Sequence, residues 1–246
     1  MAAALIVAVM TNAKRVLMIV SNPSKNILGW PVGLWGCELT HPYWEFTQTG
    51  YEVDIASPLG GKVELDSWSD PHNPQGYEVK DLVTLGFLHN AELAAKLAAT
   101  PKLADLDAAA YDLVYLVGGQ APIYTFREDA SVQTALRTAF EANKLVAAIC
   151  HGVAGLLDVK LSNGDYLIKD KVMTGFSNIE EDDVEREIKA KAIPYRIEDV
   201  AKSRGAKFVA EGLWRSYAVR DGNLVTGQQS FSARTLAKLL IETLGR

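Results

Sequence analysis

The sequence Leu145-Val-Ala-Ala-Ile-Cys150-His151-Gly152-Val-Ala-Gly155 joins five apolar residues to a cysteine and a run of small residues. The apolar run predicts a short buried strand, and the small residues predict that a helix starts directly after it. A nucleophile on such a sharp turn has a strained backbone, so its close neighbours must be small, as Ala148 and Gly152 are. The pattern indicates a nucleophile elbow with Cys150 in place of serine.

The elbow would place the sulfur of Cys150 in a position that favours a nucleophilic thiolate. It would project from the carboxyl end of a sheet and lie at a helix N-terminus, whose dipole favours thiolate over thiol. The alternative is that Cys150 is a small buried hydrophobe, as free cysteines often are. The elbow alone does not separate these two interpretations.

Composition and charge indicate one large α/β domain over residues 1–246. A chain of 246 residues with 48% hydrophobic content can bury a full core. The net charge of −5 comes without a basic stripe, which argues against nucleic acid as a partner. Cys37 and Cys150 are too few for a disulfide framework, which fits a reduced, cytoplasmic setting.

The start of the chain predicts neither a signal peptide nor a membrane anchor. Residues 1–9 are apolar but too short to span a membrane, and no basic region precedes them. Met10 could be the natural start, with residues 1–9 an upstream extension. Residues 1–13 as a whole are expected to be an N-terminal extension of the domain. No membrane partner is predicted.

Apolar runs and helical patterns alternate along the rest of the chain. Strands are expected at residues 15–20, 52–56, 112–117, 145–149, 207–210 and 224–227. Helices are expected at residues 37–49, 91–99, 131–141, 197–203 and 231–244. This rhythm predicts a doubly wound, mostly parallel sheet with helices on both faces.

Three segments do not fit the rhythm. Residues 57–90 are irregular and too long for an ordinary connection, so an insertion or lid is expected there. Residues 158–171 suggest a small β excursion around an Asn-Gly turn. The acidic residues 180–187 are expected to form an exposed segment.

In such sheets, sites form outside the carboxyl ends of the strands. Cys37-Glu38, Gly118-Gly119 and Cys150-His151 all fall at that edge. The backbone N–H of Gly119 could pair with that of His151 as an oxyanion hole, although a Gly-Gly pair is also an ordinary tight turn.

Two residue types could move protons there. Glu38 begins a helix, where an acid is a common cap, but this helix should abut the elbow. His151 could relay a proton if an acid oriented it, and Glu180 and Glu181 are both candidates. No Cys, His and Asp cluster has metal-ligand spacing, so no metal is predicted.

Taken together, the motifs resemble the ThiJ/PfpI superfamily, which has the flavodoxin-like fold of class I glutamine amidotransferases. Within it, the chain is most similar to the branch of glutathione-independent glyoxalase III and chaperone-like proteins. The resemblance extends from about Arg15 onward. It rests on Gly36-Cys-Glu38-Leu-Thr-His41-Pro-Tyr43, Tyr51-Glu-Val-Asp-Ile-Ala-Ser-Pro-Leu-Gly-Gly61, Gly118-Gly119, Ala148-Ile-Cys150-His151-Gly152, Thr174-Gly-Phe-Ser-Asn-Ile-Glu-Glu181, Arg204-Gly-Ala-Lys207 and Leu224-Val-Thr-Gly227-Gln.

The resemblance implies a role for each matching residue. Cys150 would be the nucleophile, and His151 the elbow histidine. Glu38 would be the acid beside the thiol, and Glu181 the acid that orients the histidine. Gly119 and His151 would supply the oxyanion-hole N–H groups.

The chain departs from the branch directly after the glycine pair. The branch usually has His-Gly there, whereas this chain has Gln120-Ala-Pro122. We expect Gly118 and Gln120 to contact substrate, with an amide in place of an imidazole. Aromatic residues are expected at the pocket mouth, where they would suit a bulkier carbonyl compound or serve as ordinary packing: Trp30, Trp35, Tyr124 and Phe126.

The resemblance implies a cofactor-independent lyase that converts 2-oxoaldehydes such as methylglyoxal to 2-hydroxy acids through a Cys150 hemithioacetal. It also implies a homodimer that acts in stress defence. Three alternatives stay open: a stress-response chaperone or redox sensor, a protein deglycase that uses the same cysteine, and an amidase or peptidase.

Overall fold

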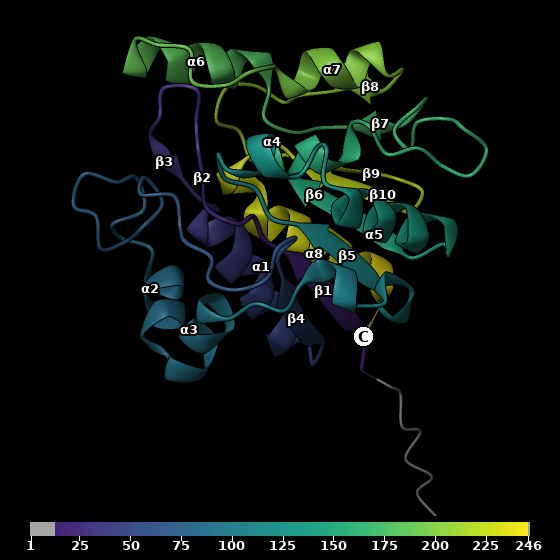
Figure 1. The fold of residues 1–246 in the computed structure, drawn as a ribbon, viewed down its shortest axis with the longest axis horizontal. Helices are drawn as coiled ribbons and strands as arrows, with labels where there is room; N and C mark the ends of the chain where they lie inside the picture. Colours follow the sequence, from purple (N-terminus) through teal and green to yellow (C-terminus); the bar gives the residue numbers. More distant parts are fainter. Residues whose placement is uncertain (1–12, 246) are drawn as a thin grey trace, which may run out of the picture.

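A computed structural model describes residues 13–245 of the protein (Figure 1). The expected N-terminal extension therefore lies almost entirely outside the described residues. At the centre is a six-stranded sheet in the order β4-β1-β5-β6-β10-β9. Its strands are β4 (Glu52–Ala56), β1 (Arg15–Ile19), β5 (Leu113–Leu116), β6 (Leu145–Ile149), β10 (Leu224–Gly227) and β9 (Ala218–Asp221).

Five strands of this sheet run parallel, and the hairpin strand β9 is antiparallel to β10. β5 and β6 are buried along their whole length, as central strands covered on both faces must be. The expected doubly wound, mostly parallel fold is confirmed.

Successive side chains of the central strands enter two different cores, because strand side chains alternate between faces. One face of β6 packs Val146 and Ala148 into the core that contains Leu136 of α5 (Ala130–Glu141). The other face packs Ala147 and Ile149 with helices α1 (Gly36–Gln48) and α8 (Ala233–Leu244). Helices thus cover both faces of the sheet.

The remaining elements surround the carboxyl edge and the flanks. The helices are α2 (Leu82–His89), α3 (Ala91–Ala98), α4 (Pro122–Thr125), α6 (Asn178–Ile188) and α7 (Ile197–Ser203). Single 3-10 turns are η1 (Leu103–Asp105), η2 (Ala108–Ala110) and η4 (Ser230–Ser232), and η3 (Cys150–Leu156) follows β6. Two small sheets pair β2 (Ser24–Lys25) with β3 (Pro31–Val32), and β7 (Val172–Met173) with β8 (Lys207–Phe208). Figure 1 shows α6 and α7 along one edge of the molecule.

Four expectations need correction. Residues 180–187 are not an exposed segment but part of α6, with Glu180 and Glu181 buried. Residues 57–90 are irregular only up to α2. The strand at 207–210 is two residues long and lies in a separate small sheet. The β excursion at 158–171 reduces to one bridge between Lys160 and Tyr166.

Candidate active site

The turn after β6 has the strained backbone that the elbow predicts. Cys150 has a φ of 56°, in the left-handed region that non-glycine residues rarely adopt. Ile149 ends the strand, and the 3-10 helix η3 starts at Cys150 itself. A methyl group on Gly152 would lie 2.8 Å from the carbonyl oxygen of Leu116, so only glycine fits this turn.

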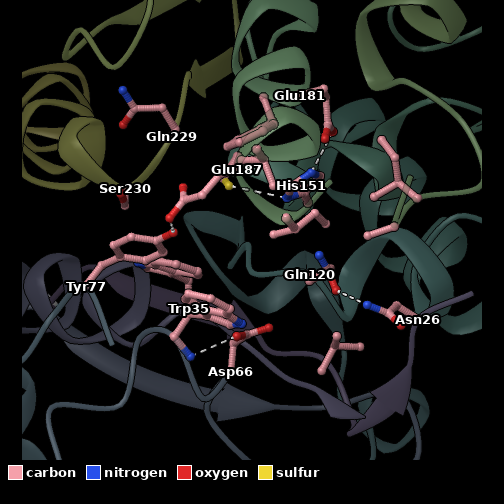
Figure 2. A pocket seen from close by; sticks show the side chains of 18 of the residues that line it. Asn26, Trp35, Asp66, Tyr77, Gln120, His151, Glu181, Glu187, Gln229 and Ser230 are labelled. Carbon is pink, nitrogen blue, oxygen red and sulfur yellow. Dashed lines mark hydrogen bonds and ion pairs between the residues drawn. The ribbon is translucent and has the colours of Figure 1, made fainter. Parts of the chain in front are cut away.

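The side chains of Cys150, His151 and Glu181 form a hydrogen-bonded chain (Figure 2). His151 Nδ1 lies 3.6 Å from the sulfur of Cys150, and Nε2 lies 2.8 Å from Oε1 of Glu181. A carboxylate only accepts, so Nε2 donates to Glu181, and in the neutral imidazole Nδ1 then presents a lone pair to the thiol. Phe176 stacks on the imidazole at 4.3 Å and helps to fix its plane.

The start of α6 explains why Glu181, and not Glu180, meets the histidine. Glu180 forms a capping box with Ser177, whose N–H and hydroxyl both donate to Oε2 at 3.0 and 2.8 Å. Its other oxygen accepts from Gln228 Nε2 at 2.7 Å. Glu180 thus anchors the helix, and the next residue is directed at His151.

Glu38 reaches the same place from the first turn of α1. The glutamate is fully buried, and both its carboxyl oxygens lack a hydrogen-bond partner of good geometry among the described residues. A methyl group on Gly118 would lie 2.2 Å from Oε2 of Glu38 and 2.8 Å from Cβ of Cys150. The absence of a side chain at Gly118 therefore lets the carboxyl group approach the cysteine, and no larger residue fits there.

Burial raises the pKa of Glu38 to about 8, and the charge of Glu78 adds to the increase. The carboxyl group is therefore mostly protonated at neutral pH. Its carboxyl oxygens accept no hydrogen bond from the backbone N–H groups at the start of α1, so Glu38 lies in the first turn without acting as a hydrogen-bonded cap.

The pKa of Cys150 is also raised well above its usual value, first by burial and then by the neighbouring Glu38. Burial and Glu38 thus outweigh the stabilisation of the thiolate that is expected from the elbow. The N–H groups of His151 and Gly119 act in the opposite direction, because both hydrogen-bond the sulfur. These are the two donors expected for the oxyanion hole.

Gly119 needs to be glycine for two reasons. Its φ is 110°, which side chains rarely tolerate, and a methyl group there would lie 2.4 Å from the backbone nitrogen of Trp35. The glycine pair is thus more than a plain turn, since it lets the loop before α1 approach the elbow.

A cavity of about 800 Å³ opens beside these residues. Gln120 lines it, and its Oε1 accepts from Asn26 Nδ2 at 2.9 Å (Figure 2). Trp30 and Trp35 also line it, as expected.

Two of the four aromatic residues expected at the mouth lie elsewhere. Phe126 is fully buried in the core beneath α5, and the hydroxyl of Tyr124 donates to the carbonyl of Ala192. Five aromatic residues that the sequence did not indicate also line the cavity: Trp68, Tyr77, Phe176, Trp214 and Phe231. The first four come from irregular segments or loops, where no periodicity indicates direction, and Phe231 lies in the short turn η4.

Cys37 differs from Cys150 in its surroundings. Its sulfur lies 3.6 Å from Oε1 of Glu78, and burial and then that carboxylate raise its pKa. It is absent from the described residues that line the cavity.

The parallel sheet, the strained cysteine elbow and the buried glutamate define the class of α/β proteins with a cysteine nucleophile elbow. Sequence comparison places the chain in the same class. The chain belongs to the DJ-1/PfpI family, whose pattern matches residues 33–243. It is 32% identical over 220 residues to Glyoxalase 3 of Candida albicans, covering 87% of this chain and 90% of that protein. It is 33% identical over 224 residues to the glutathione-independent glyoxalase HSP31 of Saccharomyces cerevisiae, covering 88% and 91%.

Solved structures give the same result. The Rapid Encystment Protein of Francisella tularensis superposes with a TM-score of 0.86 at 31% identity, over 95% of this chain and all of that one. Glyoxalase III of Candida albicans superposes with a TM-score of 0.77 at 28% identity, over 93% and 96%. The resemblance to the ThiJ/PfpI superfamily and its glyoxalase III branch is confirmed.

Among residues 13–245, no three His, Cys, Asp or Glu side chains are grouped as a metal site requires. No helix in that part of the chain has the length and apolar character needed to cross a membrane.

Proposed function

We propose that this protein is a cofactor-independent cysteine enzyme of the glyoxalase III type, converting 2-oxoaldehydes such as methylglyoxal to 2-hydroxy acids. The observation that carries the proposal is the buried chain of Cys150, His151 and Glu181, with the carboxyl group of Glu38 beside the same sulfur. The relatives from Candida and Saccharomyces, both named as glyoxalases, support it.

The first step is addition. The sulfur of Cys150 forms a bond to the aldehyde carbon, and the thiol proton passes to Nδ1 of His151. The electron pair of the carbonyl moves to its oxygen, where the N–H groups of Gly119 and His151 stabilise the negative charge. Protonation of this oxygen completes the hemithioacetal.

The second step moves a hydrogen between the two carbons. A base, Glu38 or His151, removes the proton from the sulfur-bearing carbon to give an enediol, and a proton returns to the neighbouring carbon. The first carbon is oxidised to a thioester while its neighbour is reduced to an alcohol, so no external oxidant is needed. With a pKa of about 8, Glu38 can both give and take a proton near neutral pH.

The third step is hydrolysis. Water attacks the thioester carbon, the carbon–sulfur bond breaks, and the sulfur takes up a proton. The 2-hydroxy acid leaves, and the sum of the reaction is the addition of one water molecule.

A protein deglycase is the second candidate. The protein/nucleic acid deglycase HchA of Pseudomonas aeruginosa is 26% identical over 217 residues, covering 84% of this chain and 71% of that protein. A cavity of about 800 Å³ could admit a carbonyl adduct on a larger molecule. A redox sensor is less well supported, because such a role favours an exposed thiol of low pKa, and Cys150 is buried with a raised pKa.

We also propose that residues 57–90 act as a lid within a single domain over residues 1–246. Trp68, Tyr77 and Glu78 of this segment line the cavity, and the hydroxyl of Tyr77 donates to Glu187 of α6 at 2.6 Å. The homodimer and the cytoplasmic location rest on the resemblance and the cysteine content, and remain predictions.

The test is turnover of methylglyoxal and phenylglyoxal, with the hydroxy acid product followed by NMR. Wild type and Cys37→Ala should form the product, whereas Cys150→Ala should lose nearly all activity. Comparable rates for wild type and Cys150→Ala would refute the proposal. Release of hydroxy acid from glycated peptide, but not from free 2-oxoaldehyde, would favour the deglycase.

A further inference from the structure

The cavity beside Cys150 is rich in carboxyl groups. Of the described residues that line it, seven are aspartate or glutamate, and none is lysine or arginine. Two of them already have a cation beside them. Asp183 forms an ion pair with Arg186, and Glu185 forms one with Arg196. The carboxylates of interest are those without such a cation.

Glu78 and Glu187 have only neutral partners at the cavity. Oε1 of Glu78 accepts from the indole Nε1 of Trp35 at 3.2 Å, and Oε1 of Glu187 accepts from the hydroxyl of Tyr77 at 2.6 Å. Neither glutamate forms an ion pair within residues 13–245. Figure 2 shows Tyr77 and Trp35 on one side of the cavity, with His151 and Glu181 across from them.

The wall beside these two carboxylates is aromatic. Tyr77 stacks on Trp35 with ring centroids 6.4 Å apart and on Trp68 at 5.2 Å, and all three rings line the cavity. The electron-rich face of a tryptophan or tyrosine attracts a cation, most strongly where water is partly excluded. Carboxylate and ring faces therefore favour the same kind of ligand.

With these two carboxylates and no lysine or arginine among the described lining residues, the mouth has a negative potential. A cationic ligand would relieve this potential, and an anionic ligand would increase it. The hydrogen bond to Glu187, after burial itself, also raises the pKa of Tyr77.

The size of the cavity points beyond methylglyoxal. A volume of about 800 Å³ lies within the range that holds a drug-sized ligand, and methylglyoxal would leave most of it empty. We propose that the preferred substrate is a 2-oxoaldehyde carrying a bulky apolar group with a positive charge at its far end. Its aldehyde lies at Cys150 and its cationic group near Glu78 and Glu187, on the wall of Trp35, Tyr77 and Trp68. The assignment of this cation as part of a substrate rests on the proposed function.

Three phenylglyoxals that differ in the charge of one para substituent test the proposal: trimethylammoniomethyl, the isosteric neutral neopentyl, and sulfomethyl. The methylene group insulates the aldehyde from the electronic effect of the charge. We expect kcat/KM of wild type for the cation to exceed that for the neutral compound by about fivefold or more at low salt. The anion should be slowest, and added salt should reduce the preference. Equal values, or a preference for the anion, would overturn the proposal.

Two isosteric variants locate the effect. Glu78→Gln and Glu187→Gln should each reduce the cation-to-neutral ratio by about threefold. Glu52→Gln is the matched control, because it removes the same charge at the opposite edge of the sheet. Glu52 starts β4, which runs parallel to β6 through β1 and β5, whereas Cys150 follows the carboxyl end of β6. Its ratio should stay at the wild-type value, and a ratio unaffected by either cavity variant would contradict the assignment.

Binding separates this proposal from the catalytic one. Acetophenones with the same three para substituents cannot undergo the reaction, and calorimetry measures their affinity for wild type directly. Absence of turnover for every 2-oxoaldehyde would refute the proposed function alone, and a cation preference in binding would still support the charged subsite. Turnover without any charge preference in either measurement would refute the subsite alone.

Discussion

Glu38 is the residue whose chemistry depends most on its surroundings. It enters from the first turn of α1, is fully buried, and has a pKa of about 8. In the unfolded chain the same carboxyl group would have the ordinary pKa of about 4.5. The folded protein therefore binds this proton more tightly than the unfolded chain does. Ionisation of the buried carboxyl group thus lowers the free energy of unfolding as the pH rises through neutrality.

We predict that Glu38→Gln stabilises the protein at neutral pH. The stability that the bound proton gives wild type is fully present below about pH 4.5 and is lost as the pH rises toward about 8. At pH 7 the variant, which cannot ionise, should be more stable by on the order of 3 kcal/mol, with little difference at pH 4. Urea denaturation at both pH values measures this.

The same variant should lose turnover by about 10²–10⁴-fold, because a proton-transfer group is removed. A variant that is neither stabilised at pH 7 nor impaired in turnover would contradict both the raised pKa and the proposed role of Glu38.

Gln120 is the second residue for which a substitution is informative. It stands where the branch usually has histidine, lines the cavity, and pairs with Asn26. An amide can donate and accept hydrogen bonds but does not titrate near neutral pH. We predict weak activity on methylglyoxal, with kcat/KM increased by Gln120→His and a pH optimum shifted toward the imidazole range.

Steady-state kinetics of both forms across pH check this prediction, with phenylglyoxal as the second substrate. Efficient turnover of methylglyoxal by wild type, without any gain in Gln120→His, would make position 120 part of the cavity wall only.

At the scale of elements, the start of α6 positions the orienting carboxylate. The capping box of Ser177 and Glu180 fixes the first turn, and Glu180 is tied in addition to Gln228 beyond β10. Glu181 faces His151 because hydrogen bonds from Ser177 and Gln228 to Glu180 hold the first turn of the helix in place.

We predict that Ser177→Ala lowers the free energy of unfolding by about 1 kcal/mol, the usual cost of a lost N-cap. It should also lower kcat more than it changes KM, because Glu181 would orient His151 less well while the cavity wall remains. Ser203→Ala, which removes a hydroxyl that donates within α7, is the control and should leave kcat unchanged. A loss of stability with wild-type kcat would show that the capping box does not position Glu181.

At the scale of the whole molecule, the fold gives the two cysteines different access to solvent. Both are buried and both have a raised pKa. Cys150 opens into the cavity, with hydrogen bonds from two backbone N–H groups, whereas Cys37 lies against Glu78 and the carbonyl of Ser230.

We predict that limiting iodoacetamide labels Cys150 before Cys37, and that the rate increases with pH because the thiolate reacts. Peptide mass spectrometry assigns the label. Earlier labelling of Cys37 in the folded protein would contradict the position of the reactive sulfur.

The sequence by itself determined the five parallel strands of the sheet, the main helices that cover its faces, and the elbow. Apolar periodicity and the cysteine followed by small residues are local signals, and packing in the fold leaves them intact. They were sufficient to predict β6, the turn at Cys150 and the need for a small residue at position 152, which the structure narrows to glycine.

Only the tertiary structure decided the charges and the cavity. The acidic segment 180–187 indicated exposure, yet Glu180 and Glu181 are buried because Ser177, Gln228 and His151 bind them there. Desolvation, which raises the pKa of Glu38 and Cys150, is a sum over atoms from distant segments. The aromatic wall likewise comes from loops without a period, so no local pattern could indicate which rings face the sulfur.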